Sequence, residues 1–284
     1  MKIVHTRGEL ELARSDYADR AVAFVPTMGA LHQGHRRLLQ RAHEDPSAAL
    51  FVSIFVNPLQ FAPGEDLDRY PRPIEADLAM CEAEGADLVF VPGDEELYAG
   101  GAPAVTVTAG ALGDVLEGRT RPGHFDGVLT VVTKLCNLVR PSAAYFGQKD
   151  AQQLALVRRM VRDLDMPVEV VGVPTVRDDD GLALSSRNVY LDADQRTQAL
   201  ALSRALNAAA ASGPHGVHAV FEEAQAVLAG APGVKLDYLE LRDADTFGAV
   251  DGHTTHALLL VAAWVGGTRL IDNATLDLGV TVER

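Results

Sequence analysis

Apolar and polar positions along the chain alternate between two kinds of pattern. Residues 21–25 and 48–56 are short, nearly continuous apolar runs, typical of strands covered on both faces of a parallel sheet. Between them, from Gly34 onward, Leu38, Leu39 and Ala42 have the spacing of one helix face. The alternation continues with predicted strands at 88–91, 143–146 and 168–173 and predicted helices at 74–84, 128–139 and 150–162. This order predicts a doubly wound α/β domain.

The pattern changes after Pro174. A charged turn at 177–181 precedes two Ala-rich helical stretches, and strand-like runs then follow one another without a helix between them. We therefore predict two domains, a parallel-sheet domain at 1–176 and a smaller α+β domain at 177–284. The second domain is expected to contain helices at 194–211 and 217–228, a loop at 210–216, and strands at 234–241, 257–265 and 268–271.

Composition and charge restrict the classes of partner. The 284 residues are 48% apolar and 23% charged, as in a globular protein with a sizeable core. The formal net charge is -14, which disfavours nucleic-acid backbones and anionic membranes as partners. Any phosphate that the chain binds is therefore expected to be small and locally compensated.

The cysteines and the hydropathy pattern indicate the compartment. Cys81 and Cys136 lie far apart without a second thiol nearby, which fits a reducing environment better than a disulfide framework. The first eleven residues alternate charged with apolar side chains, and no uncharged apolar run is long enough to span a membrane. We expect a cytoplasmic protein.

The loop at 26–35 has the composition of a phosphate site. It connects a predicted strand to a predicted helix, where α/β sheets bind ligands, and a helix N-terminus with nearby glycines favours anions. His32 and His35 lie three residues apart and could donate hydrogen bonds to charge that develops on phosphorus. Two alternatives remain open: the histidines cap the helix, or they bind zinc. No Gly-x-x-x-x-Gly-Lys-[Ser/Thr] loop occurs.

Polar residues follow the other predicted strands as well. Asn57 and Gln60 come after the second strand, where their amides suit a hydroxylated substrate, although a turn held by Pro58 is the alternative. Lys149 follows a later strand and could neutralise a phosphate, unless it is a solvated surface lysine. Because the carboxyl ends of parallel strands share one edge, these side chains are expected to converge.

Two further segments carry charge or hydroxyl groups. Residues 185–187, Ser-Ser-Arg, form a loop that could close on a triphosphate or could be a simple Ser-rich turn. Residues 118–125 concentrate cations in an acidic chain, and both a lid and a dimer contact remain open for them.

Five ordered motifs together resemble the pantothenate synthetase family, whose members are also called pantoate-beta-alanine ligases. His-x-Gly-His at 32–35 alone would indicate only the wider nucleotidyltransferase superfamily, but order and spacing match over nearly the whole chain. The resemblance implies a homodimer with a Rossmann-like N-terminal domain and a smaller C-terminal domain. It also implies that pantoate and beta-alanine are joined to pantothenate while ATP becomes AMP and pyrophosphate. The motifs span residues 28–35, 55–61, 121–125, 147–150 and 184–188.

The resemblance also implies roles for individual residues. Gln60 and Gln153 would hold pantoate, to which we add Asn57, and Gln60 would lie near beta-alanine. His35 is implied as the proton donor. The implied ATP contacts are Met28, Gly29, Ala30, Leu31, His32, Gln33, Gly34, His35, Gly147, Gln148, Lys149, Asp150, Val176, Leu184, Ser185, Ser186 and Arg187. The chain departs from the usual family pattern at Gln33, Gln148, Ala151 and Leu184.

These roles lead to a mechanistic hypothesis. His32, His35, Lys149 and Arg187 are expected to act with Mg²⁺ in stabilising the transferred phosphorus centre and the departing pyrophosphate. Magnesium would be held largely by phosphates and water, and Asp77 is the one protein ligand that we consider. Closure of the C-terminal domain as a lid would shield a pantoyl-adenylate intermediate from water.

Two other functions fit part of the pattern. One is a different His-x-Gly-His nucleotidyltransferase that leaves the nucleotide on its product, against which Asn57, Gln60 and Gln153 argue. The other is a nucleotide-binding regulator without turnover, which would not need His35 and Lys149. The acidic charge also disfavours an aminoacyl-tRNA synthetase.

Overall fold

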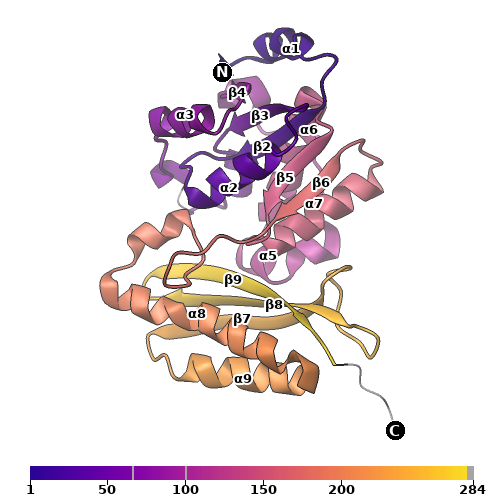
Figure 1. Ribbon diagram of the computed structural model, residues 1–284. Helices are drawn as coiled ribbons and strands as arrows, with labels where there is room; N and C mark the ends of the chain where they lie inside the picture. Colours follow the sequence, from indigo (N-terminus) through magenta and orange to yellow (C-terminus); the bar gives the residue numbers. More distant parts are fainter. Residues whose placement is uncertain (66, 100, 280–284) are drawn as a thin grey trace. The chain divides into compact units, whose positions relative to one another are not determined.

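The chain forms two compact units (Figure 1). The computed structural model describes residues 1–65, 67–99 and 101–279, so the last five residues of the second predicted domain lie outside the described part. The first unit comprises residues 1–148 and 152–174, and the second comprises residues 149–151 and those from 175 onward. The chain therefore passes into the second unit briefly at 149–151, before it enters that unit for good.

The first unit contains a six-stranded sheet in which every neighbouring pair of strands is parallel. This confirms the predicted doubly wound α/β class. The short edge strand β1 was not predicted, because its Lys-Ile-Val sequence lies in a stretch where charged and apolar residues alternate instead of forming an apolar run. In spatial order the strands are β1 (Lys2–Val4), β4 (Leu88–Phe90), β3 (Ala49–Ile54), β2 (Val22–Thr27), β5 (Ala143–Gly147) and β6 (Glu169–Val173).

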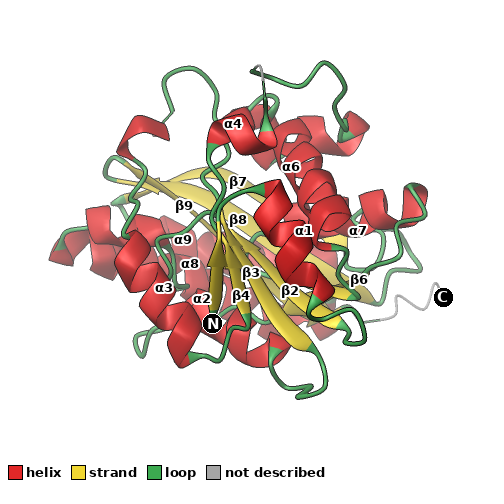
Figure 2. Ribbon diagram, turned by 90° about the horizontal axis from the view of Figure 1, so that it is seen from above, coloured by secondary structure: helices red, strands yellow, loops and turns green. Residues whose placement is uncertain are grey.

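Helices cover both faces of this sheet (Figure 2). Alternate residues of a strand point to opposite faces, so Phe24 and Val25 of β2 belong to different hydrophobic clusters. Both are fully buried, which explains why the strands are apolar without interruption. One face is packed by α1 (Arg7–Ser15), α6 (His124–Val139) and α7 (Ala151–Asp163), and the other by α2 (Gln33–Ala42) and α3 (Ile74–Ala83).

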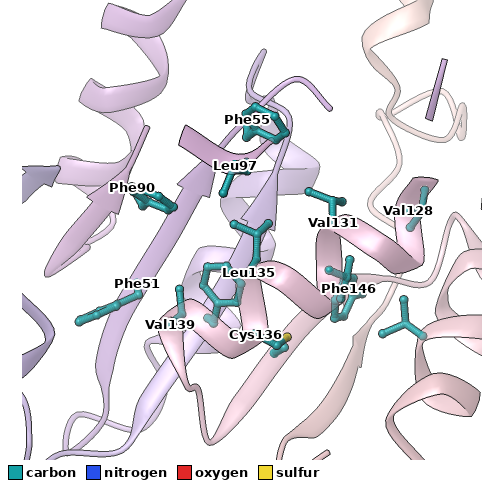
Figure 3. Close-up of a cluster of buried hydrophobic side chains, with 14 of the residues drawn as sticks. Phe51, Phe55, Phe90, Leu97, Val128, Val131, Leu135, Cys136, Val139 and Phe146 are labelled. Atoms are coloured by element: carbon teal, nitrogen blue, oxygen red, sulfur yellow. The ribbon is translucent and has the colours of Figure 1, made fainter. Parts of the chain in front are cut away.

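Helix α6 supplies much of the core on its face of the sheet. Figure 3 shows Val131, Leu135 and Val139 on the side of the helix toward Phe51 and Phe90. The helix begins at His124, four residues before the predicted start, because its first turn lacks the apolar spacing on which the prediction depended. This extra turn carries the polar contacts of His124 with the Gln60 carbonyl and of Asp126 with the Ala109 N–H.

Short elements occupy the loops of the first unit and were not predicted. They follow the strands β3 and β4 or precede α6, and each has five residues or fewer. They are η1 (Pro58–Gln60), η2 (Leu67–Arg69), α4 (Asp94–Leu97), η3 (Gly110–Asp114) and α5 (Glu117–Thr120).

The second unit is an antiparallel sheet packed on two helices, which confirms the α+β prediction. The expected loop at 210–216 is wrong: α8 continues through Ser212, since alanine favours helix, and a 3-10 turn, η5 (Gly213–His215), follows it. The last strand extends beyond residue 271 because it pairs with β8 along its whole length. The elements are η4 (Ser186–Tyr190), α8 (Ala193–Ser212), α9 (Val217–Ala229), β7 (Val234–Asp243), β8 (His256–Val265) and β9 (Thr268–Asp277).

Among the described residues, none of the helices combines the length and the apolar character that crossing a membrane requires.

Candidate active site

The strand order of the first unit creates a switch point beside β2. The chain runs from β2 to β3 on one side and later returns to β5 on the other side of β2 (Figure 1). In open α/β sheets, the crevice at such a point, outside the carboxyl ends of the strands, is where ligands bind. The loop from Met28 follows β2 there, and Gln148 follows β5. Two of the predicted nucleotide loops therefore leave neighbouring strands of the sheet.

His32 and His35 cap the first turn of α2 with their side chains. His32 Nδ1 accepts from the Gly34 N–H at 3.1 Å, and His35 Nδ1 accepts from the His32 N–H at 3.2 Å. A ring nitrogen that accepts a hydrogen bond carries no proton, so the proton of each ring is on Nε2. The capping alternative is thus confirmed, and it fixes the tautomer of each ring with the proton on Nε2.

Gly34 allows this arrangement because it has no side chain. A Cβ at this position would lie 2.8 Å from Cε1 and 3.0 Å from Nδ1 of His32. The two rings have centroids 4.2 Å apart. The glycine of the His-x-Gly-His motif is therefore required by the close approach of the first imidazole to the helix backbone.

Asp77 holds the loop after β2 through the backbone N–H groups of Ala30 and Leu31. Its carboxylate is only 2% exposed and accepts the Ala30 N–H at 2.9 Å and the Leu31 N–H at 2.7 Å, one on each oxygen. Burial raises the pKa of Asp77, and the two N–H donors act in the opposite direction. In the structure both carboxylate oxygens hold the loop, and the magnesium contact considered from the sequence stays a prediction. The sequence signal for a structural role was the position of Asp77 in the first turn of α3, where an acidic side chain is favoured.

Asn57 is used entirely within the protein. Its Nδ2 donates to Gln60 Oε1 at 3.0 Å and to the Gly127 carbonyl at 3.1 Å. Its Oδ1 accepts from the Tyr98 hydroxyl at 2.8 Å and from the Leu59 N–H at 3.3 Å. All four hydrogen-bonding positions of the amide are occupied by protein groups, one of them the Gln60 side chain, and a pantoate contact by Asn57 stays a prediction.

Tyr98 is a further residue that the sequence did not single out. Burial, with a smaller contribution from Asp94, raises the pKa of its hydroxyl, which therefore stays protonated and donates to Asn57. The two residues are 41 positions apart, and no local pattern links them.

The segment 118–125 lies against the same turn as Asn57. Arg121 and His124 both contact the carbonyl of Gln60. These two side chains thus lie against the turn that carries Gln60, and a lid and a dimer contact stay predictions for the segment.

Two neighbouring glutamines of α7 behave differently. Gln152 is buried and donates to the Leu112 and Val115 carbonyls, at 2.8 and 2.9 Å, while its Oε1 accepts from the Glu117 N–H at 3.1 Å. Gln153 is half-buried and remains the predicted pantoate contact. The adjacent, buried glutamine is the structural one.

Lys149 and its neighbours belong to the second unit. The Lys149 carbonyl accepts from Asn273 Nδ2 of β9 at 2.8 Å. Beside this contact, Arg177 forms a two-pronged ion pair with the buried carboxylate of Asp272, at 2.6 and 3.0 Å. The backbone that carries Lys149 is therefore held by a strand near the end of the chain.

The second unit also brings Val176 and residues 184–187 together. The Leu184 N–H donates to the Val176 carbonyl at 3.0 Å, and Arg177 and Ala183 form an antiparallel bridge. The Ser185 side chain accepts from the Arg187 N–H at 3.2 Å and caps the short helix η4. Predicted nucleotide contacts that lie eight residues apart thus form one turn.

No group of three or more His, Cys, Asp or Glu side chains suited to a metal ion occurs within residues 1–65, 67–99 and 101–279. The zinc alternative for His32 and His35 therefore lacks additional ligands in that part of the chain.

Comparison with known proteins gives a consistent set of relatives. A family model described as pantoate-beta-alanine ligase matches residues 2–275. The pantothenate synthetase of Nocardioides sp. is 57% identical over 98% of this chain and 86% of that protein. The crystal structure of pantothenate synthetase from Thermus thermophilus is 48% identical with a TM-score of 0.89, covering 96% of this chain and 99% of that one.

A second solved structure adds ligands to the comparison. It is pantoate-beta-alanine ligase from Francisella tularensis, complexed with beta-gamma ATP and beta-alanine. It is 30% identical with a TM-score of 0.79, and the match covers 96% of this chain and 97% of that one.

Proposed function

Because the chain belongs to the pantoate-beta-alanine ligase family, we propose that it condenses pantoate with beta-alanine to pantothenate and converts ATP to AMP and pyrophosphate. The observation that carries this proposal is the histidine pair after β2, whose rings cap the helix through Nδ1 and carry their protons on Nε2, at a helix N-terminus beside the switch point. Such donors suit an enzyme that must stabilise charge on phosphorus.

The first step activates the acid. The carboxylate of pantoate is ionised at neutral pH, so it attacks the α-phosphorus of ATP without a general base, and pyrophosphate leaves. The barrier is mainly positioning and charge repulsion. We assign His32 and His35 to the phosphoryl oxygens, and Lys149 and Arg187 to the negative charge of the phosphates.

The second step forms the amide. The neutral amine of beta-alanine attacks the acyl carbon of pantoyl-adenylate, AMP departs, and the amine loses a proton. Water would hydrolyse this intermediate, so we propose that residues 177–284 act as a lid that shields it.

Gln60 and Gln153 are assigned to the hydroxyl and carboxyl groups of pantoate. The Oε1 of Gln60 already accepts a hydrogen bond from Asn57, so its Nε2 is the end that can donate to a substrate oxygen. The solved Francisella tularensis ligase is complexed with beta-alanine. This supports our proposal that the site of this chain also has a position for beta-alanine.

Magnesium, the homodimer and the cytoplasmic location are further parts of the proposal. The described residues contain no group of three or more side chains suited to bind a metal ion, and both carboxylate oxygens of Asp77 accept hydrogen bonds from backbone N–H groups. We therefore propose that magnesium binds together with the phosphates of ATP. When bound there, it would neutralise phosphate charge. Cys81 and Cys136 are buried free thiols, which suits a reducing compartment.

The test is a product assay with purified protein. ATP, Mg²⁺ and pantoate are incubated with and without beta-alanine, and pyrophosphate, AMP and pantothenate are followed by mass spectrometry. We expect pantothenate and AMP only when both substrates are present. A product that retains the nucleotide would instead identify another His-x-Gly-His nucleotidyltransferase, and binding of ATP without turnover would identify a regulator.

A further inference from the structure

Arg121 is a cation held largely out of solvent. Its side chain is 21% exposed, and that of its partner Glu65 is 22% exposed. Nε and Nη2 of Arg121 donate to the two carboxylate oxygens of Glu65, at 3.1 and 2.6 Å. A two-pronged pair of this kind fixes the plane of the guanidinium as well as its position.

The remaining donors of Arg121 point at two groups that matter for the site. Nη2 also donates to the Gln60 carbonyl at 3.3 Å, and Nη1 donates to His124 Nε2 at 3.1 Å. His124 is 8% exposed, and its Nδ1 lies 2.8 Å from the same Gln60 carbonyl. A guanidinium can only donate and a carbonyl can only accept, so His124 carries its proton on Nδ1 and donates it to Gln60.

The helix that carries His124 also touches the backbone of this turn directly. A Cβ on Gly127 would lie 2.3 Å from the Leu59 carbonyl oxygen and 2.7 Å from the Gln60 nitrogen. No side chain fits there, so the first turn of α6 packs against η1 backbone to backbone. The Gly127 carbonyl in turn accepts from Asn57.

Gln60 is consequently held at both ends. Arg121 and His124 donate hydrogen bonds to its backbone carbonyl, and Asn57 donates one to its side-chain oxygen, Oε1. Gln60 is 7% exposed, so little freedom remains in the direction of its Nε2–H groups. We propose that Arg121 and His124, with Glu65 behind them, are positioning residues that aim the Gln60 amide at the acid substrate.

This inference rests on the proposed function, because it assumes that Gln60 binds pantoate. It assigns residues 121 and 124 to substrate positioning, in contrast to a lid or a dimer contact. A purely structural cluster would instead affect folding alone. The two roles separate in kinetics, since displacement of a substrate-orienting group acts on one substrate and leaves the others in place.

The test compares kcat and KM for pantoate, beta-alanine and ATP in four variants and the wild type. For Arg121→Met and His124→Phe we expect kcat/KM for pantoate to fall about 10- to 100-fold, with KM for ATP within about twofold of wild type. His124→Asn keeps a donor where Nδ1 lies, so it should recover most of the loss. Arg119→Met is the matched control, because Arg119 is an exposed arginine two residues away.

Each outcome decides the inference. Melting temperatures are measured in parallel, so that a variant that folds poorly is recognised and the His124→Asn and His124→Phe pair still provides the comparison. Unchanged pantoate kinetics in folded Arg121→Met and His124→Phe would overturn the positioning role while leaving the proposed function intact. If the wild type produces no pantothenate, the proposed function fails and this inference fails with it.

Discussion

His32 and His35 each have two nitrogens with separate tasks. One nitrogen caps the helix, and the proton is thereby confined to the other. The capping that the structure shows and the phosphate chemistry that we propose are therefore compatible, because the helix itself selects the tautomer of both rings. Substitutions that copy one nitrogen at a time can separate the two tasks.

His35→Asn and His35→Gln form such a pair. The amide of asparagine reaches the position of Nδ1 and retains the cap but removes the Nε2–H donor, so we expect kcat to fall about 100- to 1000-fold with little change in stability. Glutamine reaches the position of Nε2 and should retain more activity while lowering stability by about 1 kcal/mol. Turnover and urea unfolding measure the two effects. Equal kinetics in both variants would contradict the division of tasks.

At this scale the sequence indicates which residue types gather at the strand ends, but not how each is used. Asn57 and Gln60 are similar amides three residues apart. Yet the Asn57 amide makes all its hydrogen bonds within the protein, whereas for the Gln60 side chain only Oε1 is bonded to Asn57. The partners that decide this, Tyr98 and Gly127, are 41 and 70 residues away. Contacts of that range depend on the completed fold.

At the scale of elements, the long apolar strands and amphipathic helices were predictable, and the short connecting elements were not. Burial on both faces leaves an unmistakable apolar run in β3, whereas η1 has only Asn57 and Pro58 as signals. Yet η1 carries Gln60, and the proposed positioning residues lie at the start of α6, in the turn before it and in the loop after η1. Functional geometry in this unit resides in the elements with the least periodicity.

The pair of Glu65 with Arg121, in the segments beside these elements, gives the fold a pH dependence. Burial acts to raise the pKa of Glu65, but the hydrogen bonds and charge of Arg121 outweigh it and hold the pKa below its ordinary value of 4.5. A lowered carboxyl pKa stabilises the fold above about pH 4.5, and this contribution is lost as the pH falls through the lower folded-state value.

We therefore expect Glu65→Gln to be less stable than wild type by about 1 kcal/mol at pH 7, with the difference shrinking below about pH 4.5. Urea unfolding of both proteins between pH 7 and pH 3 measures the difference. A difference that stays constant over this range would show that the ionised pair does not contribute.

At the scale of the whole molecule, the resemblance predicts a homodimer. Each chain has a mass of 30.3 kDa, so light scattering after size-exclusion chromatography should give about twice that value. The same measurement on Arg121→Met tests whether residues 118–125 also form the dimer contact, in which case that variant would dissociate. A wild-type mass equal to one chain would contradict the dimer.

The path of the chain between its two units limits how the protein can be divided. A fragment that ends at Pro174 would include Lys149 in its sequence, but it would lack Asn273, which binds the carbonyl of that lysine from near the other end of the chain. Proteolysis or gene dissection at the evident boundary would thus separate Lys149, which we propose neutralises phosphate charge, from its support. Restoring activity would require adding back the C-terminal fragment, because the lysine loop is completed only by β9, which lies more than 100 residues later in the chain.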